Sequence, residues 1–267
     1  PWFYAHSEEF SRVKEAKKSY ELGLRCVAKT PFLSEIVSAE HDVPVELVTP
    51  GLDHSVFYPG SQDRHFGKPR LAGMLRLATS RRGGKETIEL LRLLRTRLPE
   101  LEVTMFGDAS SLPSDLKGFV KMTGELSPRE VAAVYQDSDI VVDLSYWHGF
   151  GRTGIEGMSC GAVPVMSASG GVARYAQDGE NSFIVDGQDL EIAADRIISL
   201  AVNRELRLKM RTAGLVSTRR FSETLAVDDW IELLEVKSAL KPEDDLFSTR
   251  NSKEISTVSS YGRRAAR

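Results

Sequence analysis

The residues with the clearest chemical potential lie in one stretch, Trp147–Val165, which reads WHGFGRTGIEGMSCGAVPV. Gly149, Gly151 and Gly154 stand within six positions, and Glu156 follows shortly after them. Glycine lets the main chain adopt positive φ and approach a ligand closely, and the free amides at a helix start attract anions such as a diphosphate. Glu156, one turn into the expected helix, can reach hydroxyl groups of the same ligand. A tight packing turn would need the same glycines, and that alternative stays open.

The elements that must position this stretch alternate between strands and helices. Short apolar segments at 70–75, 101–107, 139–145 and 162–167 are typical of buried strands, and the stripe of apolar residues over 85–98 is typical of an amphipathic helix. This alternation predicts an α/β fold, a Rossmann-like parallel sheet with helices on both faces. Ligands of such sheets lie outside the carboxyl ends of the strands, which is where the glycine-rich turns of this chain fall.

Local signals mark further elements. Ser127–Glu130 (SPRE) is a capping box with proline at the first helical position, Pro31 marks another helix start, and the glycine stretch should become helical near Thr153. Further strands are expected over 24–30, 43–51, 118–124 and 182–185, and further helices over 8–22, 190–202, 204–215 and 222–238.

Composition narrows the class of protein. The 267 residues include 35 basic and 38 acidic side chains, giving a net charge of −3, so we expect no nucleic-acid partner. No apolar run approaches the roughly 20 residues of a membrane span, and no signal peptide is visible. Cys26 and Cys160 lie in apolar segments, which predicts buried thiols in a reducing compartment. We therefore expect a cytoplasmic location.

Several motifs are set aside. Asp137–Asp139 spells D-x-D, a metal-binding pattern in another fold, but it lies between a helix and a strand, where aspartates cap and turn. The five histidines show no ligand spacing for zinc. RRGGK at 81–85 lacks the order of a nucleoside triphosphate-binding loop, and no G-x-G-x-x-G follows the first strand. We expect neither a metal nor another cofactor.

From about residue 43 to residue 234 the chain resembles the carboxyl-terminal half of GT-B glycosyltransferases, in particular glycosyltransferase family 4. VELVTPGLDHSVFYP (45–59) matches the linker motif of that family, and MLRLATSRRGGKETIELL (74–91) matches its strand and helix with a basic turn. The third match, 124–185, contains the glycine stretch. Its FGRTGIE variant and the RRG turn are most similar to bacterial enzymes that build rhamnose-containing surface polysaccharides.

The resemblance implies roles for individual side chains. Glu156 matches the second glutamate of the family's E-x7-E element, which holds the nucleotide ribose. Arg76 and Arg82 match basic residues that face the donor diphosphate, and Arg81 can substitute for Arg82. His148 stands where the family has the first glutamate, which contacts the transferred sugar. These four positions, His148, Glu156, Arg76 and Arg82, are the expected catalytic residues.

The remaining expected contacts to the donor lie mainly in two glycine turns. They are Arg81, Gly149, Phe150, Gly151, Arg152, Thr153, Gly124, Gly170 and Gly171. Histidine in place of glutamate at position 148 is the plain departure from the family. It indicates a different donor sugar or weakened activity, and the alternative is a ring that packs on Trp147.

The implied reaction transfers a sugar from a nucleotide-diphosphate sugar to a glycan or lipid-linked glycan. Arginine and a helix start, not a metal, stabilise the departing diphosphate. The family retains anomeric configuration. The basic segment 207–214 favours an acidic lipid headgroup, so peripheral membrane association at the inner face is also expected. Alternative functions are a nucleotide-sugar-binding scaffold and a sugar-nucleotide epimerase.

The same resemblance divides the chain. Residues 1–58 are the expected remnant of an amino-terminal, acceptor-side domain with its linker, and 59–238 form a nucleotide-sugar-binding Rossmann-like domain. Residues 239–267, rich in serine and threonine, are expected to be a flexible tail or linker. Because the sequence opens on Pro1, we expect further modules in a longer parent protein.

Overall fold

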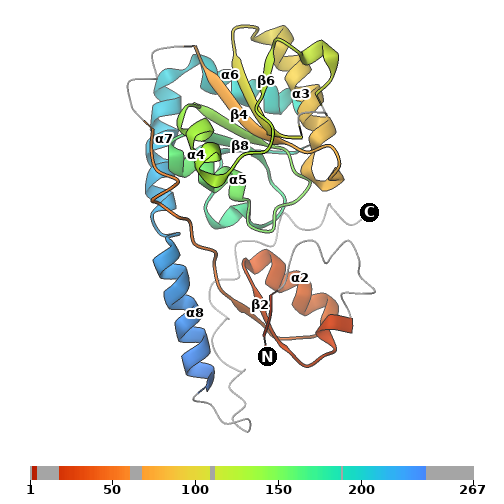
Figure 1. Ribbon diagram of the computed structural model, residues 1–267, viewed down its shortest axis with the longest axis vertical. Coiled ribbons are helices and arrows are strands. Elements are labelled where there is room, and N and C mark those ends of the chain that lie inside the picture. The colour runs from red at the N-terminus through yellow and green to blue at the C-terminus, as the bar shows by residue number, and fades with distance from the viewer. Residues whose placement is uncertain (1, 5–17, 61–67, 109–111, 188, 239–267) are drawn as a thin grey trace. The chain divides into compact units, whose positions relative to one another are not determined.

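The computed structural model describes residues 2–4, 18–60, 68–108, 112–187 and 189–238. They form two parallel sheets (Figure 1). The smaller sheet has the order β1-β2-β3, and its strands are β1 (Trp2–Tyr4), β2 (Arg25–Ala28) and β3 (Val45–Leu47). Helix α2 (Pro31–His41) begins at the predicted proline, and the Thr30 side chain caps its start. Most of the helix predicted over 8–22, and the tail predicted over 239–267, lie outside the described residues.

The larger sheet has six strands, all parallel, in the order β6-β5-β4-β7-β8-β9. Their bounds are β4 (Arg70–Leu75), β5 (Glu102–Gly107), β6 (Val120–Met122), β7 (Ile140–Asp143), β8 (Val163–Ser167) and β9 (Phe183–Val185). The predicted Rossmann-like sheet is therefore confirmed.

The order of these strands creates a switch point. The chain starts in the middle at β4, moves outward through β5 and β6, and then returns to the other side of β4 with β7. The connections that leave β4 and β7 therefore diverge at the carboxyl edge of the sheet. In open parallel sheets a ligand binds in the crevice at such a point. The glycine stretch follows β7 directly, so it lies at this position.

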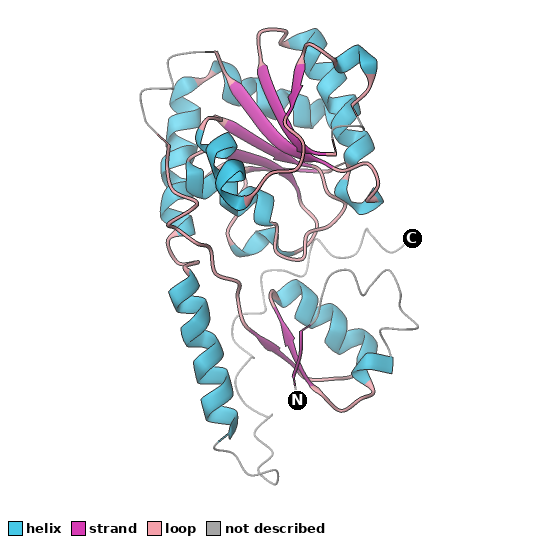
Figure 2. Cartoon of the chain, in the orientation of Figure 1, coloured by secondary structure: helices cyan, strands magenta, loops and turns pink. Residues whose placement is uncertain are grey.

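Helices cover both faces of this sheet (Figure 2). Their bounds are α3 (Gly84–Arg97), α4 (Pro128–Gln136), α5 (Arg152–Cys160), α6 (Leu190–Val202) and α7 (Arg204–Thr218). A further helix, α8 (Glu223–Ser238), follows α7 in the chain. Three short 3-10 turns are η3 (Ser80–Arg82), η5 (Ser114–Leu116) and η6 (Gly171–Arg174). Helices α3 and α6 pack together over one face, while α5 contacts β7, β8, α4 and α7 on the other.

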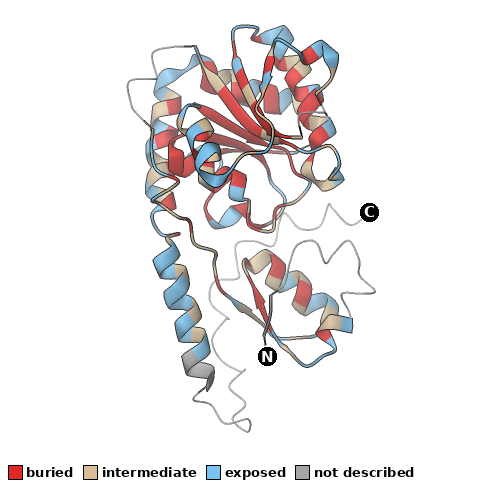
Figure 3. Ribbon diagram, viewed as in Figure 1, coloured by how far each residue is buried: buried red, intermediate tan, exposed pale blue. Residues whose placement is uncertain are grey.

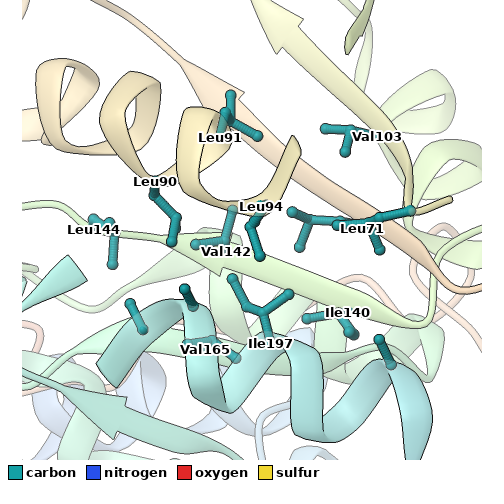
Figure 4. Close-up of a cluster of buried hydrophobic side chains, with 14 of the residues drawn as sticks. Leu71, Leu90, Leu91, Leu94, Val103, Ile140, Val142, Leu144, Val165 and Ile197 are labelled. Atoms are coloured by element: carbon teal, nitrogen blue, oxygen red, sulfur yellow. The ribbon is translucent and has the colours of Figure 1, made fainter. Parts of the chain in front are cut away.

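The strands are buried on both faces, and their side chains alternate between two cores. Ile140 and Val142 of β7 face the core formed with α3 and α6, whereas Val141 faces the core formed with α4 and α5. Figure 4 shows Leu90 and Leu94 of α3 directed at the first of these cores. Burying a side chain of this size stabilises the fold by about 1.5–3 kcal/mol. Figure 3 shows the same pattern, with red, buried strands between helices whose outer faces are exposed.

The segment that connects the two sheets packs into a core of the larger sheet. The Leu52 amide donates to the Phe221 carbonyl at 2.6 Å, and both Leu52 and Phe57 are buried in the core on the α4 and α5 side. Both residues precede residue 59, the expected first residue of the nucleotide-sugar-binding domain. None of the described helices is both long and apolar enough to cross a bilayer.

Candidate functional site

The glycine stretch forms a loop that ends in a helix start. Gly151 has φ 86° and caps α5, so the helix begins close to the predicted position. The first amides of a helix have no partner within it. In the described part of the chain, no carbonyl accepts a hydrogen bond from the amides of residues 149–154. The loop therefore offers a row of donors suited to an anion.

The glycines of α5 also serve packing. A Cβ at Gly151 or at Gly154 would lie 2.6 Å from the Tyr175 hydroxyl oxygen, and one at Gly157 would lie 2.7 Å from Val141 Cγ2. Only hydrogen fits at these positions, so the helix can lie tightly on β7 and beside η6. Gly154 is therefore required for packing. This agrees with the alternative given for the sequence, that a tight packing turn needs the same glycines.

The second glycine turn is bonded to the first. The His148 amide donates to the Ser169 carbonyl at 2.9 Å, and the Gly171 amide donates to the His148 carbonyl at 2.7 Å. Gly170 has φ 102°, in the region that favours glycine. The Thr30 hydroxyl donates to the Gly149 carbonyl at 2.9 Å. The structure therefore brings the two predicted turns together.

The predicted cations lie around the switch point. Arg76 is exposed and follows β4 directly, while Arg81 and Arg82 end the turn η3. The Tyr146 amide donates to the Arg81 carbonyl at 2.8 Å, and the Arg81 guanidinium lies 5.5 Å from the Trp147 ring centre. These contacts fasten the basic turn to the loop that leaves β7.

Glu156 projects from the first turns of α5. Its side chain is 12% exposed and accepts a hydrogen bond from Arg152 Nε at 2.8 Å, while the Arg152 side chain is 57% exposed. Burial raises the pKa of Glu156, and the charge and hydrogen bond of Arg152 oppose that rise. Arg152 is therefore the counter-ion of the carboxylate.

His148 faces the interior. Its side chain is 1% exposed, Nε2 lies 3.0 Å from Ser167 Oγ, and Nδ1 lies 3.7 Å from Asp143 Oδ2. Burial lowers the pKa of His148, the charge of Asp143 raises it, and the charge of Arg82 lowers it further. The ring thus points toward the ends of β7 and β8. The His148 side chain would have to rotate to contact a sugar.

Three other residues that were expected to contact the donor do not present a side chain to the glycine turns. The Phe150 ring is buried against Tyr175 and Phe221, with centroid distances of 5.7 and 5.8 Å, so only its backbone can contact a ligand. Thr153 is buried and hydrogen-bonded to a tyrosine, Tyr135. Gly124 follows β6, and its carbonyl accepts a hydrogen bond of 2.8 Å from the Gly107 amide at the end of β5, the strand beside β4.

Sequence reasoning missed a buried polar group beneath the loops. Asp143 Oδ1 accepts from the Ser145 amide at 3.0 Å and from the Ser145 hydroxyl, and Ser167 Oγ donates to the Ser145 carbonyl. Tyr175, also missed, donates to the Gly151 carbonyl. The available signal was a polar residue at the end of an apolar strand, since Asp143 ends β7 and Ser167 ends β8.

The D-x-D motif and the two cysteines have structural roles, as expected from the sequence. Asp139 Oδ2 accepts from the Arg70 amide at 3.0 Å, and its Oδ1 lies 3.3 Å from Arg207 Nε, so the D-x-D motif ties β4 to α7. Cys26 and Cys160 are buried thiols, and burial raises the pKa of Cys160 to about 12.

Comparison with known proteins identifies the family. Residues 38–215, more than half of the chain, match the family described as glycosyl transferases group 1. The chain belongs to this family. Similar curated proteins include D-inositol 3-phosphate glycosyltransferases of Arthrobacter, 29% identical over 74% of the chain, and of Mycolicibacterium smegmatis, 31% identical over 60%. The chain spans about half the length of the curated relatives it matches, 52% and 40% in these two cases.

Solved glycosyltransferase structures share the fold of this group 1 chain. The Anabaena protein HepE, solved with UDP-glucose, superposes with a TM-score of 0.75 at 16% identity, over 88% of this chain and 72% of that one. Sucrose-phosphate synthase of Thermosynechococcus elongatus gives 0.72 at 19% identity, over 88% and 65%. The GT-B fold expected from the sequence is therefore confirmed.

Proposed function

We propose that this chain is the donor-binding part of a glycosyltransferase that takes its sugar from a nucleotide-diphosphate sugar. The observation that carries the proposal is the row of amides over 149–154, which have no hydrogen-bond partner among the described residues and follow β7 at the switch point, where Arg76 also follows β4. Amides at a helix start and guanidinium groups suit phosphate oxygens. The Glu156 carboxylate, one turn into α5, accepts hydrogen bonds and suits the ribose hydroxyl groups.

In the proposed reaction, the bond between the sugar and the diphosphate breaks, and the acceptor hydroxyl oxygen bonds to the anomeric carbon as its proton is lost. Negative charge grows on the departing phosphate. Arg82, Arg76 and the start of α5 stabilise this charge, so the step needs no metal ion. Losing one such preorganised contact typically lowers the rate about 10²–10³-fold. The anomeric configuration is retained in this proposal, as the family resemblance implies.

We further propose a glycan or lipid-linked glycan as acceptor, in the synthesis of a bacterial surface polysaccharide. The FGRTGIE variant of the glycine stretch supports this choice, and rhamnose is the corresponding sugar. The names of the curated relatives favour a second acceptor class, an inositol phosphate. The location that we propose is the cytoplasm or the inner face of the membrane.

A panel assay tests this function. The protein is incubated with UDP-, GDP- and dTDP-sugars, each with and without glycan primers and inositol phosphate. Acceptor-dependent release of nucleoside diphosphate, together with growth of a product, is the expected result. Isomerisation of the donor without an acceptor would instead show an epimerase, and binding without turnover would show a scaffold. If none of the nucleotide sugars binds the protein, the proposed site is contradicted.

A further inference from the structure

A buried chain of polar groups lies beneath the two glycine turns, and its hydrogen atoms can be assigned. The Ser167 hydroxyl donates its only proton to the Ser145 carbonyl. Its oxygen must therefore accept from His148 Nε2, 3.0 Å away. The neutral imidazole carries one ring proton, so Nε2 holds it and Nδ1 is left bare.

The bare nitrogen faces a carboxylate. His148 Nδ1 lies 3.7 Å from Asp143 Oδ2, and both side chains are more than nine-tenths buried. Among the described residues, Oδ2 has no hydrogen-bond partner, because Asp143 bonds to Ser145 through Oδ1 alone. Two lone pairs thus face each other inside the protein. One added proton would join them.

The charge of Arg82 acts on this pair from outside. Arg82, at the end of η3, disfavours a positive charge on His148, whereas Asp143, at the end of β7, favours it. Tyr175 and Tyr135 also lie within reach of the Asp143 charge, and burial raises their pKa values so far that both stay neutral. An anion that binds beside Arg82 would offset its charge and make protonation easier.

We propose that His148 is a positioning residue that takes up a proton on Nδ1, held against Asp143 Oδ2, when an anionic donor binds beside Arg82. The proton comes from hydronium in the solvent: an O–H bond breaks, the Nδ1–H bond forms, and no other covalent bond changes. Because the backbone of His148 is bonded to Ser169 and Gly171, the new hydrogen bond fixes both glycine turns around the bound diphosphate. This inference rests on the proposed function, since it needs a donor that is held by Arg82.

Calorimetry measures the proton uptake directly. UDP-glucose is titrated into the protein at about pH 6, near the ordinary pKa of histidine, in buffers with different ionisation enthalpies. Its phosphates are diesters that do not titrate there, unlike the terminal phosphate of UDP. We expect uptake of a fraction of one proton per UDP-glucose bound, and tighter binding as the pH falls. Binding without uptake would overturn the inference.

Variants assign the uptake to this pair. His148→Gln keeps an amide donor for Ser167 but cannot take up a proton, so the uptake should disappear. Asp143→Asn should also abolish it, because an amide satisfies both Ser145 and the bare Nδ1. His41→Gln, which removes the histidine at the end of α2, is the matched control and should leave the uptake unchanged. Uptake that persists in His148→Gln would contradict the proposal.

A ligand-free measurement keeps the inference separate from the proposed function. Histidine ¹⁵N spectra of the whole chain, assigned with His148→Gln, should show a neutral His148 ring protonated on Nε2 at pH values above about 7. A charged ring, or a proton on Nδ1, would refute the assignment. If these spectra agree but no nucleotide sugar binds, the proposed function fails while the hydrogen-bond assignment stands.

Discussion

At the scale of single residues, the site places ionisable groups where burial works against their charge. Glu156 is mostly buried beside Arg152, and burial raises its pKa. A raised pKa means that the folded chain holds this proton more tightly than the unfolded chain. The stability that the carboxyl contributes is therefore present below its ordinary pKa of 4.5 and lost as the pH rises through its folded value. Burial thus opposes the charged form of this carboxyl, and perturbed pKa values of this kind cluster at functional sites.

The variant Glu156→Gln separates binding from stability. We expect UDP-glucose affinity to fall about 10- to 100-fold, because hydrogen bonds to a charged group contribute about 1.5–3 kcal/mol. The melting temperature at pH 7 should stay the same or rise, since a neutral amide avoids the cost of a buried charge. Calorimetric titration and thermal unfolding measure the two effects. Glu89→Gln, on the exposed face of α3, is the control. Unchanged affinity in Glu156→Gln would mean that Glu156 does not contact the donor.

His148 predicts a pH dependence of the opposite sign. Burial holds its pKa below the ordinary value of 6.5, so the unfolded chain binds this proton more readily. The stability it contributes is complete above pH 6.5 and is lost as the pH falls toward the folded value. The free energy of unfolding, measured by denaturant titration, should therefore decline less steeply below this pH in His148→Gln. Parallel curves for the two proteins would exclude this effect.

At the scale of elements, the site depends on how closely the start of α3 approaches the loop after β7. Gly83 has φ 61°, and a Cβ there would overlap with the Leu144 carbonyl oxygen. The backbone of η3 is also bonded to this loop through Arg81 and Tyr146. The basic turn and the glycine stretch, far apart in the sequence, are held together by these contacts.

Gly83→Ala should therefore destabilise the chain strongly. Positive φ alone costs about 1–2 kcal/mol for a residue with a Cβ, and the overlap with Leu144 adds to this cost. Gly118→Ala is the matched control, because Gly118 has φ 90° but open space around its Cβ position. We expect denaturant unfolding to show at least about 2 kcal/mol more loss for Gly83→Ala. Equal losses of unfolding free energy in the two variants would mean that the close approach of Gly83 to Leu144 does not contribute to stability.

The D-x-D motif gives a second contrast between neighbours. Asp139→Ala leaves the buried Arg207 without its carboxylate and should reduce stability by about 3–5 kcal/mol. Asp137→Ala removes an exposed pair with Arg70 and should cost less than about 1 kcal/mol. Thermal and denaturant unfolding distinguish them. A small loss for Asp139→Ala would contradict the structural role assigned to this motif.

Sequence reasoning located the elements well because each carries its own local signal. Apolar runs predict β4, β5, β7 and β8, and the capping box at Ser127 forms as predicted at the start of α4. The group of Asp143, His148 and Ser167 was not predictable in the same way. Its members follow two different strands and meet only because β7 and β8 are neighbours, and strand order is not a local property.

At the scale of the whole molecule, the order of strands explains where the site lies. The chain begins the larger sheet at its centre and reverses direction between β6 and β7, which leaves the crevice beside β4 and β7 for a ligand. In the proposed function, the residues described there bind the donor. The acceptor is recognised elsewhere in the proposal, which agrees with the half-length match to the curated relatives.

The central claim is that the amides of the glycine stretch and the nearby arginines hold the diphosphate of a nucleotide sugar. A crystal structure of the protein with UDP-glucose tests it most directly. We predict phosphate oxygens within hydrogen-bond distance of amides between residues 149 and 154, with Arg82 or Arg76 on the opposite side. UDP-glucose bound elsewhere, with both arginines directed away from its phosphates, would contradict the account.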